Sequence, residues 1–197
     1  MKALVYLGPC QKALEERRKP ALLAATDAIV RMTRTTLSDI DLRIVQGDVP
    51  SCRPGRILGR EGFGVIDEAG PSVTAFRPGD PVLISAVSTC GQCAACRRRM
   101  PSRCRDGGWL LGHRIDGTQA HYVRIPHADT SLYPVPPGTD EESLVMLSDL
   151  LPAADPGSEP DRGPAITHWF RFDRIVAAYD DFALAAGAHR LRVIIQT

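Results

Sequence analysis

The 197-residue sequence has no long apolar run and no excess of charge of either sign. No stretch approaches the roughly 20 apolar residues that a helix needs to span a bilayer. Residues 1–6 form too short an apolar stretch for a signal peptide and predict a strand instead. With 24 basic and 23 acidic side chains, the net charge of +1 gives no field that would attract nucleic acid or a membrane. We therefore expect a cytoplasmic protein with no nucleic-acid partner and no membrane partner.

The sequence also lacks the glycine fingerprint of a dinucleotide-binding domain. That fingerprint reads Gly-x-Gly-x-x-Gly, whereas the nearest cluster here, Gly59-x-x-Gly62-x-Gly64, has the wrong order. We find no internal repeats, and 44% hydrophobic with 24% charged residues is an ordinary globular composition. The length suits one domain, or one domain with a small lobe.

Short segments separated by glycine and proline dominate the first two thirds of the sequence. Residues 27–33 alternate between apolar and polar toward their end, and a turn at 78–81 precedes another apolar stretch. This pattern favours a small, irregular β-barrel over an open parallel sheet. The strands that we predict are 2–7, 27–33, 62–68, 82–85, 120–125 and 132–135, with a last one at 191–195.

Two helices are predicted near the end of the sequence. Thr139 and Glu142 form a capping-box signature before an apolar pattern of helical spacing that ends at Leu151. The second helix covers 172–186, and Gly187 suits the position just after it. Between the two helices, residues 152–165 contain four prolines, two glycines and no large apolar side chain. They predict a linker with no core of its own.

Four of the six cysteines lie within fifteen residues, in the pattern Cys90-x2-Cys93-x2-Cys96-x7-Cys104. In a cytosolic chain such a cluster indicates a metal site more than a set of disulfides. Four thiolates satisfy a tetrahedral zinc ion and leave no position for water, so the site would be structural. Bacterial iron–sulfur runs have a last gap of three residues that ends in Cys-Pro. We predict one structural zinc in a lobe over residues 88–107, with an iron–sulfur cluster or disulfides as alternatives.

Five arginines accompany the cysteines. Zinc with four thiolates carries a net negative charge, so we expect the guanidinium groups to offset that charge and to donate to the sulfurs. A phosphate-binding patch is the alternative. It is less favoured because neither interleaved aromatic residues nor a nucleic-acid motif accompanies the cluster. The arginines are at positions 97, 98, 99, 103 and 105.

Several motifs, in the same order along the chain, resemble those of zinc-dependent alcohol dehydrogenases in the medium-chain dehydrogenase/reductase superfamily. Residues 54–66 resemble the family's G-H-E-x-x-G-x-V segment, and 76–82 resemble F-K-x-G-D-R-V. The cysteine lobe matches in spacing and position, and 116–123 is similar to the G-x-x-A-E-Y strand that follows it. Residues 166–182 resemble the C-terminal I-T-H-x-F and A-Y-x-x-F elements. The resemblance covers nearly the whole chain.

The resemblance implies a mainly β fold with some α-helix, namely a GroES-like β-barrel with a structural zinc lobe and a C-terminal helix–strand return. In that family a Rossmann domain is inserted between the N-terminal part and the return. Here the two parts, 1–151 and 166–197, are joined by the linker at 152–165. That linker cannot hold a dinucleotide domain of about 120–150 residues. We therefore expect a single domain over 1–197, with no Rossmann domain and no NAD(P).

The resemblance also shows that ligands of the family's catalytic zinc are replaced. Ser38 stands where the family has its cysteine ligand, and Arg60 stands where it has its histidine ligand. A neutral hydroxyl is a poor zinc ligand, and a guanidinium has no lone pair to offer. Ile40 and Arg43 occupy the positions of the family's proton relay. We therefore expect no catalytic zinc.

Arg60 is expected to take the vacated cation position. Glu61 and Asp149 keep the identities that the family has there, and Asp39 replaces a glycine. Carboxylates that converge without a cation are costly to ionise, and the guanidinium fork suits pairing with one of them. The alternative is that Arg60 points into solvent. Trp109 resembles a residue of the family's substrate pocket, although a lone tryptophan more often packs in a core.

These changes predict a chain that is not competent for NAD(P)-dependent redox chemistry. The first hypothesis is a non-redox enzyme of the acid/base type, or a binder of a small molecule, in the former substrate cleft. The alternative is a non-catalytic interaction protein whose uncovered cleft face, around Leu147, Leu150 and Leu151, docks a partner protein or a second copy. A decayed paralogue with no retained role is a third reading. The candidate cleft residues are Ser38, Asp39, Arg60, Glu61, Trp109 and Asp149.

Overall fold

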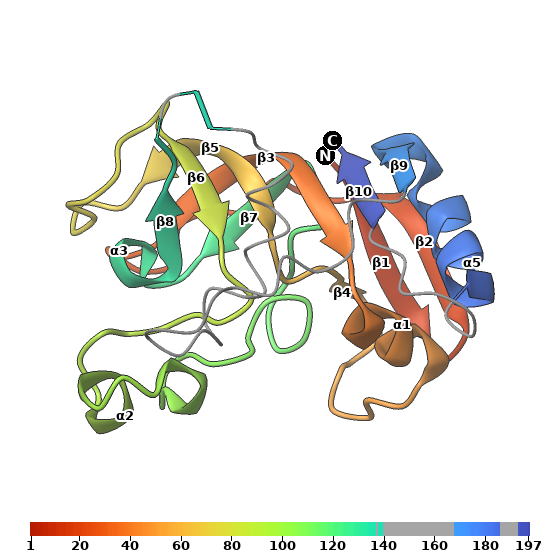
Figure 1. Cartoon of the computed structure of the whole chain (residues 1–197), viewed down its shortest axis with the longest axis horizontal. Helices are drawn as coiled ribbons and strands as arrows, with labels where there is room; N and C mark the ends of the chain where they lie inside the picture. Colours follow the sequence, from red (N-terminus) through yellow and green to blue (C-terminus); the bar gives the residue numbers. More distant parts are fainter. Residues whose placement is uncertain (137, 140–167, 186–192) are drawn as a thin grey trace.

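The computed structural model describes residues 1–136, 138–139, 168–185 and 193–197 (Figure 1). The fold is mainly β with a few short helices, as the sequence predicted. The helix predicted after Thr139, the linker at 152–165, Asp149 and the three leucines of the expected docking face lie outside the described residues. In the described part of the chain, no helix is long and apolar enough to cross a membrane.

The first sheet has three strands in the order β2-β1-β4, formed by Gln11–Glu16, Lys2–Gly8 and Arg56–Ile57. Both pairings are antiparallel, and β1 and β2 form a hairpin. The sequence did not predict β2, because its Lys, Ala, Leu and Glu residues favour helix over strand. Pairing along β1 outweighs that local preference.

The second sheet has seven strands, six of them in the order β8-β6-β5-β3-β10-β9, while β7 pairs with β3. Its long strand β3 pairs antiparallel with β5, β7 and β10. The predicted strands are found with boundaries shifted by a few residues, and β9 is a strand that the sequence did not predict. The bounds are β3 Ala28–Leu37, β5 Gly62–Ala69, β6 Pro81–Ile84, β7 Tyr122–Ile125, β8 Leu132–Pro134, β9 His168–Arg171 and β10 Val193–Gln196.

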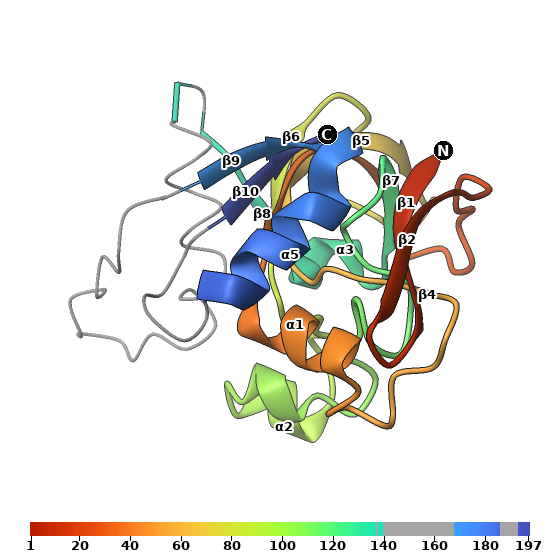
Figure 2. The same cartoon turned by 90° about the vertical axis from the view of Figure 1, so that its right-hand side faces the viewer.

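The last part of the chain returns to the first. Strand β10 lies beside β3, with Ile194 opposite Thr36, and β9 runs parallel to β10. Between them, a 3₁₀ turn (η2, Phe172–Arg174) leads into helix α5 (Ile175–Ala185), which confirms the helix predicted over 172–186. Figure 2 shows α5 on the same side of the molecule as β9 and β10. The C-terminal return therefore adds β10 and β9 to the sheet, beside the end of β3 and just before α1 begins.

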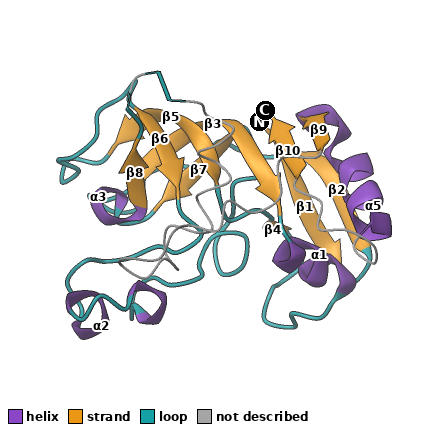
Figure 3. Ribbon diagram, in the orientation of Figure 1, coloured by secondary structure: helices purple, strands orange, loops and turns teal. Residues whose placement is uncertain are grey.

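Helix α1 (Asp39–Gln46) directly follows β3 and was not predicted. It ends at Gly47, whose φ of 90° is the left-handed cap conformation that glycine adopts without strain. The other helices are short, and Figure 3 shows α2 in the cysteine lobe, at the opposite lower corner from α1. They are α2 (Ala94–Arg97), the 3₁₀ turn η1 (Pro101–Arg103) and α3 (Ala128–Ser131).

The two largest apolar cores hold most of these elements. The larger core joins β1, β3, α1, α5 and β10, with Leu4, Ile44, Ile175 and Ile195 among its fully buried side chains. The smaller core lies under β3, β5, β6 and β7, around residues such as Val30. Because α5 and β10 contribute to the larger core, the C-terminal return is packed against the first 50 residues and fixes the position of β3 and α1.

Candidate functional site

The four cysteines predicted to bind zinc come together in the structure. Cys93 caps the start of α2, Cys96 lies within that helix, Cys104 follows η1, and Cys90 lies in the preceding loop. All four sulfurs lie within 4.8 Å of one another. The Cys93 sulfur is 3.6 Å from that of Cys96 and 4.0 Å from that of Cys104. Zn–S bonds of about 2.3 Å would place the sulfurs of a tetrahedral site about 3.8 Å apart. The geometry therefore fits a structural zinc ion.

The thiols of this cluster influence one another strongly. Backbone N–H groups of Arg105 and Cys96 point at the Cys93 sulfur and lower the pKa of Cys93 to about 6. Removal of Cys96 from water, together with the neighbouring Cys104 and Cys93 sulfurs, raises the pKa of Cys96 to about 12. Four thiolates this close repel one another, so a bound dication is what would allow all four to ionise.

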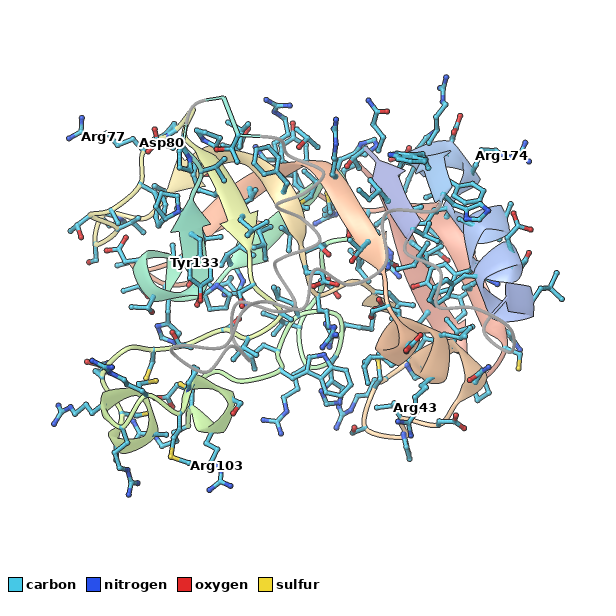
Figure 4. All side chains as sticks on the ribbon, in the orientation of Figure 1. Arg43, Arg77, Asp80, Arg103, Tyr133 and Arg174 are labelled. Carbon is cyan, nitrogen blue, oxygen red and sulfur yellow. The ribbon has the colours of Figure 1, made fainter. Side chains whose placement is uncertain are left out.

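The five arginines of the lobe are exposed to solvent. Arg105 pairs with Asp106 at 3.1 Å, and Arg98 Nε donates to the carbonyl of Ala94. Figure 4 shows Arg103 at the outer edge of the lobe. Within the described residues, the hydrogen bonds to the cluster sulfurs come from backbone amides, such as Cys90 N to Cys104 Sγ at 3.3 Å, and from neighbouring thiols, and not from guanidinium groups. The expected arginine–sulfur hydrogen bonds are therefore replaced by backbone donors.

Ser38, the residue expected from the resemblance to correspond to the family's first catalytic ligand, caps helix α1. Its hydroxyl donates to Asp41 Oδ2 at 2.6 Å, and its backbone amide donates to the same oxygen at 3.0 Å. The Asp41 amide in turn donates to Ser38 Oγ at 3.4 Å, which completes a capping box. The Ser38 hydroxyl is thus engaged within the helix terminus.

Asp41 is a functional candidate that sequence reasoning missed. Its other oxygen, Oδ1, accepts a hydrogen bond from the Gly59 amide at 3.1 Å, beside Arg60. Burial raises the pKa of Asp41, while the Ser38 hydroxyl, the Arg60 charge and backbone amides act in the opposite direction. The influence of the Arg60 charge therefore reaches Asp41. The available sequence signal was Ser38-x-x-Asp41, a capping box with Asp in place of Glu.

The backbone of Gly59 lies so close to the segment of Thr118 and Gln119 that only glycine fits before Arg60. Its φ is +88°, and a Cβ atom there would lie 2.6 Å from Thr118 Oγ1 and 2.8 Å from the Gln119 amide nitrogen. Any other residue would be strained in this conformation and would collide with that segment. Gly59 therefore holds the start of the segment that carries Arg60 and Glu61.

Glu61 is buried and held by threonines. Thr36 Oγ1 donates to its carboxylate at 2.8 Å, and the hydroxyls of Thr35 and Thr118 donate to its backbone carbonyl at 3.1 and 2.8 Å. The side chain thus comes from the residue just before β5 and meets the end of β3. Glu61 has a fixed position next to the altered ligand positions.

A hydrogen-bonded chain links this cluster to the C-terminal return. Gln119 Nε2 donates to the Thr36 carbonyl at 3.0 Å, and the Tyr179 hydroxyl of α5 donates to Gln119 Oε1 at 2.8 Å. Tyr179 is fully buried, and burial together with the nearby Asp41 charge raises its pKa well above the ordinary value. Helix α5 therefore helps to position the segment around Thr36.

The remaining predicted residues lie at the margin of this cluster. Asp39 is exposed at the first turn of α1 and, in the described structure, makes no side-chain hydrogen bond or ion pair, so the expected pairing of Arg60 with Asp39 is not formed. Trp109 is half-buried, stacks on the His113 ring at 4.3 Å between ring centres and packs against the larger core. His113 Nε2 forms a 2.7 Å hydrogen bond with the Ser51 hydroxyl.

A mainly β domain with a four-cysteine lobe and a returning C-terminal strand defines the class of medium-chain dehydrogenases that carry structural zinc. Residues 24–137 match the Alcohol dehydrogenase GroES-like domain, which is more than half of the chain. The chain belongs to the alcohol dehydrogenase family through this GroES-like domain.

Two curated relatives illustrate the similarity. The chain is 36% identical over 152 residues to Medium chain reductase/dehydrogenase ucsI of Acremonium sp, an alignment that covers 77% of this chain and 52% of that protein. It is 35% identical over 152 residues to Zinc-type alcohol dehydrogenase B of Aspergillus flavus, covering 77% of this chain and 35% of that protein. The chain thus spans about half, or less, of the length of the relatives that it matches.

Solved structures agree with this assignment. The apo form of zinc dependent alcohol dehydrogenase 2 from Streptococcus pneumonia superposes with a TM-score of 0.71 at 40% identity, over 87% of this chain and 48% of that one. Alcohol dehydrogenase TADH from Thermus sp. ATN1 superposes with a TM-score of 0.71 at 30% identity, over 77% of this chain and 44% of that one.

Proposed function

We propose that this chain is a zinc-stabilised GroES-like module that does not oxidise alcohols, and that its altered cleft binds a small molecule for non-redox chemistry. The observation that carries the proposal is the 2.6 Å hydrogen bond from Ser38 to Asp41, at the position where the family places a zinc-binding thiolate. A serine that caps a helix in this way has no tendency to bind a metal.

The second ligand position supports the same conclusion. Arg60 follows Gly59 where the family has a histidine ligand, and a guanidinium stays protonated and cannot coordinate zinc. Its positive charge acts on the buried Asp41 carboxylate. A fixed cation beside carboxylates takes over the electrostatic role of a metal ion but not its Lewis acidity.

Hydride transfer also requires a nicotinamide. Only residues 140–167 lie between the described barrel segment and β9, whereas a dinucleotide domain needs about 120–150 residues. We infer that this chain does not itself hold NAD(P) between those two parts.

The chemistry that these residues can perform is binding and proton transfer. The Arg60 guanidinium suits an anionic group of a ligand, because its planar fork matches a carboxylate or a phosphate. Glu61 is held in place by Thr36 and can act on a proton of a molecule bound next to it. We therefore favour a small, anionic ligand and acid/base chemistry.

Metal content tests the first half of the proposal. The purified full chain, grown with zinc, should contain one zinc per chain by elemental analysis, and Cys104→Ser should remove it. Cys10→Ser is the matched control, because Cys10 is exposed and lies outside the lobe. Two zinc ions per wild-type chain, or turnover of an alcohol with NAD⁺ or NADP⁺, would refute the proposal.

Ligand binding tests the second half. A thermal-shift screen with small carboxylates and phosphorylated compounds should give ligands that stabilise the wild-type chain and have much less effect on Arg60→Gln. Arg77→Gln removes the same charge from an exposed position outside the candidate cleft and should respond like wild type. If every stabilising ligand acted equally on the Arg60 variant, the altered cleft would not be the binding site.

An interaction protein is the second candidate, favoured by exposed apolar side chains on the C-terminal return. Trp169 of β9 is 57% exposed and Leu184 of α5 is 85% exposed. Surfaces of this kind often pack against another subunit. We expect any self-association measured by sedimentation to weaken in Trp169→Ser with Leu184→Ser, and a chain that stays monomeric at high concentration would remove this candidate.

A further inference from the structure

A cavity of about 340 Å³ lies on a different part of the molecule from the altered cleft. It is bordered by β4, by β7 and by the loop between β2 and β3, and none of the cleft residues described above lines it. We propose that this cavity binds a small monoanion with an apolar body, such as a medium-chain carboxylate. The proposal is independent of the function proposed above.

The floor of the cavity is apolar. Ile57 of β4 and Val123 of β7 line it and are otherwise buried, at 3% and 2% exposed. Leu23, in the loop between β2 and β3, borders the same cavity and is 77% exposed. The exposed Leu23 side chain is costly to leave in water, and an apolar ligand lying between it and the apolar floor would cover it.

A buried carboxylate fixes one wall of the cavity. Asp27 Oδ2 accepts hydrogen bonds from the amides of Leu23 and Ala24, at 3.1 and 3.0 Å, and pairs with Arg124 at 2.9 Å. Asp27 is 1% exposed, so the loop and the guanidinium are both held by a group that is shielded from water. The loop and Arg124 are therefore in place before any ligand arrives, which lowers the entropic cost of binding.

A second guanidinium is fixed in a similar way. Arg56 Nη1 pairs with Asp116 at 2.8 Å, and Arg56 Nε donates to the carbonyl of His113 at 3.1 Å. Both Arg56 and Asp116 line the cavity. A guanidinium has five N–H donors, so the edges that these bonds leave unused remain able to donate to an oxyanion.

The charges of the lining set the charge of the ligand. Asp27 and Asp116 each neutralise one guanidinium, and Glu16 pairs with the ammonium of Met1 at 3.3 Å. Arg18, also in the lining, makes no hydrogen bond or ion pair in the described structure. One positive charge is left over, which favours a ligand with one negative charge. The volume corresponds to about eleven water-sized groups, so an eight-carbon carboxylate fits.

Calorimetric titration of the zinc-loaded full chain with octanoate tests the proposal. We expect saturable binding at one site, with roughly tenfold weaker affinity for octan-1-ol, which has the same chain and no charge. Arg18→Gln should weaken octanoate binding by a similar factor. Ala21→Trp, at an exposed position of the lining, should fill the cavity and abolish binding without disturbing a core.

Two controls keep the result interpretable. Arg77→Gln removes one exposed charge that does not line the cavity and should leave the affinity for octanoate unchanged. The melting temperature of Ala21→Trp should match that of the wild type. Absence of saturable octanoate binding, equal affinity for octanol, or unchanged affinity in Arg18→Gln and Ala21→Trp would each overturn the proposal. None of these outcomes depends on Arg60, so this proposal and the function proposed above can be refuted independently of each other.

Discussion

Ser38 and Asp41 form a closed pair in which the serine hydroxyl and amide both donate to one carboxylate oxygen, at 2.6 and 3.0 Å. The pair begins helix α1 at the position that the resemblance assigns to a catalytic zinc ligand of the family. Because Asp41 also accepts from the Gly59 amide, the pair ties the start of α1 to the segment that carries Arg60. One local hydrogen-bonded motif thus fixes the start of α1 against the segment of the proposed cleft.

Loss of the Ser38 side chain should destabilise the domain. Ser38→Ala removes the helix cap and one donor to the buried Asp41 carboxylate, and we expect a cost of about 1–2 kcal/mol in the free energy of unfolding. Urea unfolding measures it. Ser102→Ala, an exposed serine in the 3₁₀ turn η1, is the control and should change stability little. An equal effect of both substitutions would mean that the cap is not formed.

Restoring the two missing ligands should create a second metal site. In a double variant with Ser38→Cys and Arg60→His, a thiolate and an imidazole would stand where a hydroxyl and a guanidinium stand now. We expect the amount of cobalt bound at saturation to rise from one to two equivalents per chain, together with the thiolate-to-cobalt charge-transfer absorption. The double variant with Ser38→Ala and Arg60→Gln is the control and should bind one. A count that stays at one in both variants would show that these two substitutions are not what prevents metal binding.

The hydroxyl of Tyr179 should matter for stability. Tyr179→Phe leaves Gln119 Oε1 without its donor in a buried position, and we expect a loss of about 1–3 kcal/mol, measured by denaturant unfolding. Tyr133→Phe is the matched control, because Tyr133 is 38% exposed on β8 and makes no side-chain hydrogen bond in the described structure (Figure 4). If the two variants were equally stable, the hydrogen bond from α5 would not contribute to the fold.

Asp129 should make the stability depend on pH. Burial alone would raise the pKa of Asp129, but the amides of Thr74 and Ala75 and the Thr74 hydroxyl, at 2.7–3.1 Å, outweigh it and lower the pKa. A carboxylate with a lowered pKa in the folded state stabilises the protein above the ordinary value of about 3.9. That stabilisation is lost as the pH falls through the lower, folded-state value.

Urea unfolding of wild type and Asp129→Asn between neutral pH and about pH 3 tests this expectation. The variant should be less stable at neutral pH, and the difference should shrink as the solution becomes acidic. Asp41 has the opposite sign, because burial raises its pKa, so its contribution declines as the pH rises. Asp41 is present in both proteins, so its contribution cancels when the free energy of unfolding of the variant is subtracted from that of the wild type. If this difference did not change with pH, the assignment to Asp129 would be contradicted.

The sequence was sufficient for the features that depend on local spacing. The cysteine lobe follows from the intervals between Cys90, Cys93, Cys96 and Cys104, and the central strands follow from short apolar segments bounded by glycine and proline. Helix α5 could be predicted because its apolar residues recur at helical spacing, as at Ile175, Tyr179 and Phe182.

The features that were missed depend on contacts between distant residues. Strand β2 has a helical composition and forms only because β1 lies beside it. The chain from Thr36 through Gln119 to Tyr179 joins three separate parts of the sequence, so no local pattern indicates it. Helix α1 gives a weak local signal because it is only eight residues long and its capping box, Ser38-x-x-Asp41, has aspartate in place of the usual glutamate.

The place of β10 in the sheet has a consequence for biosynthesis. Thr36 of β3 pairs with Ile194, a residue synthesised 158 positions later. On a ribosome, the last residues of β3 must therefore wait until 158 further positions have been synthesised before their neighbour emerges. Contacts this far apart slow folding and leave an unpaired strand edge open to association during translation. Removal of β10 would accordingly lower the soluble yield before it affects any ligand.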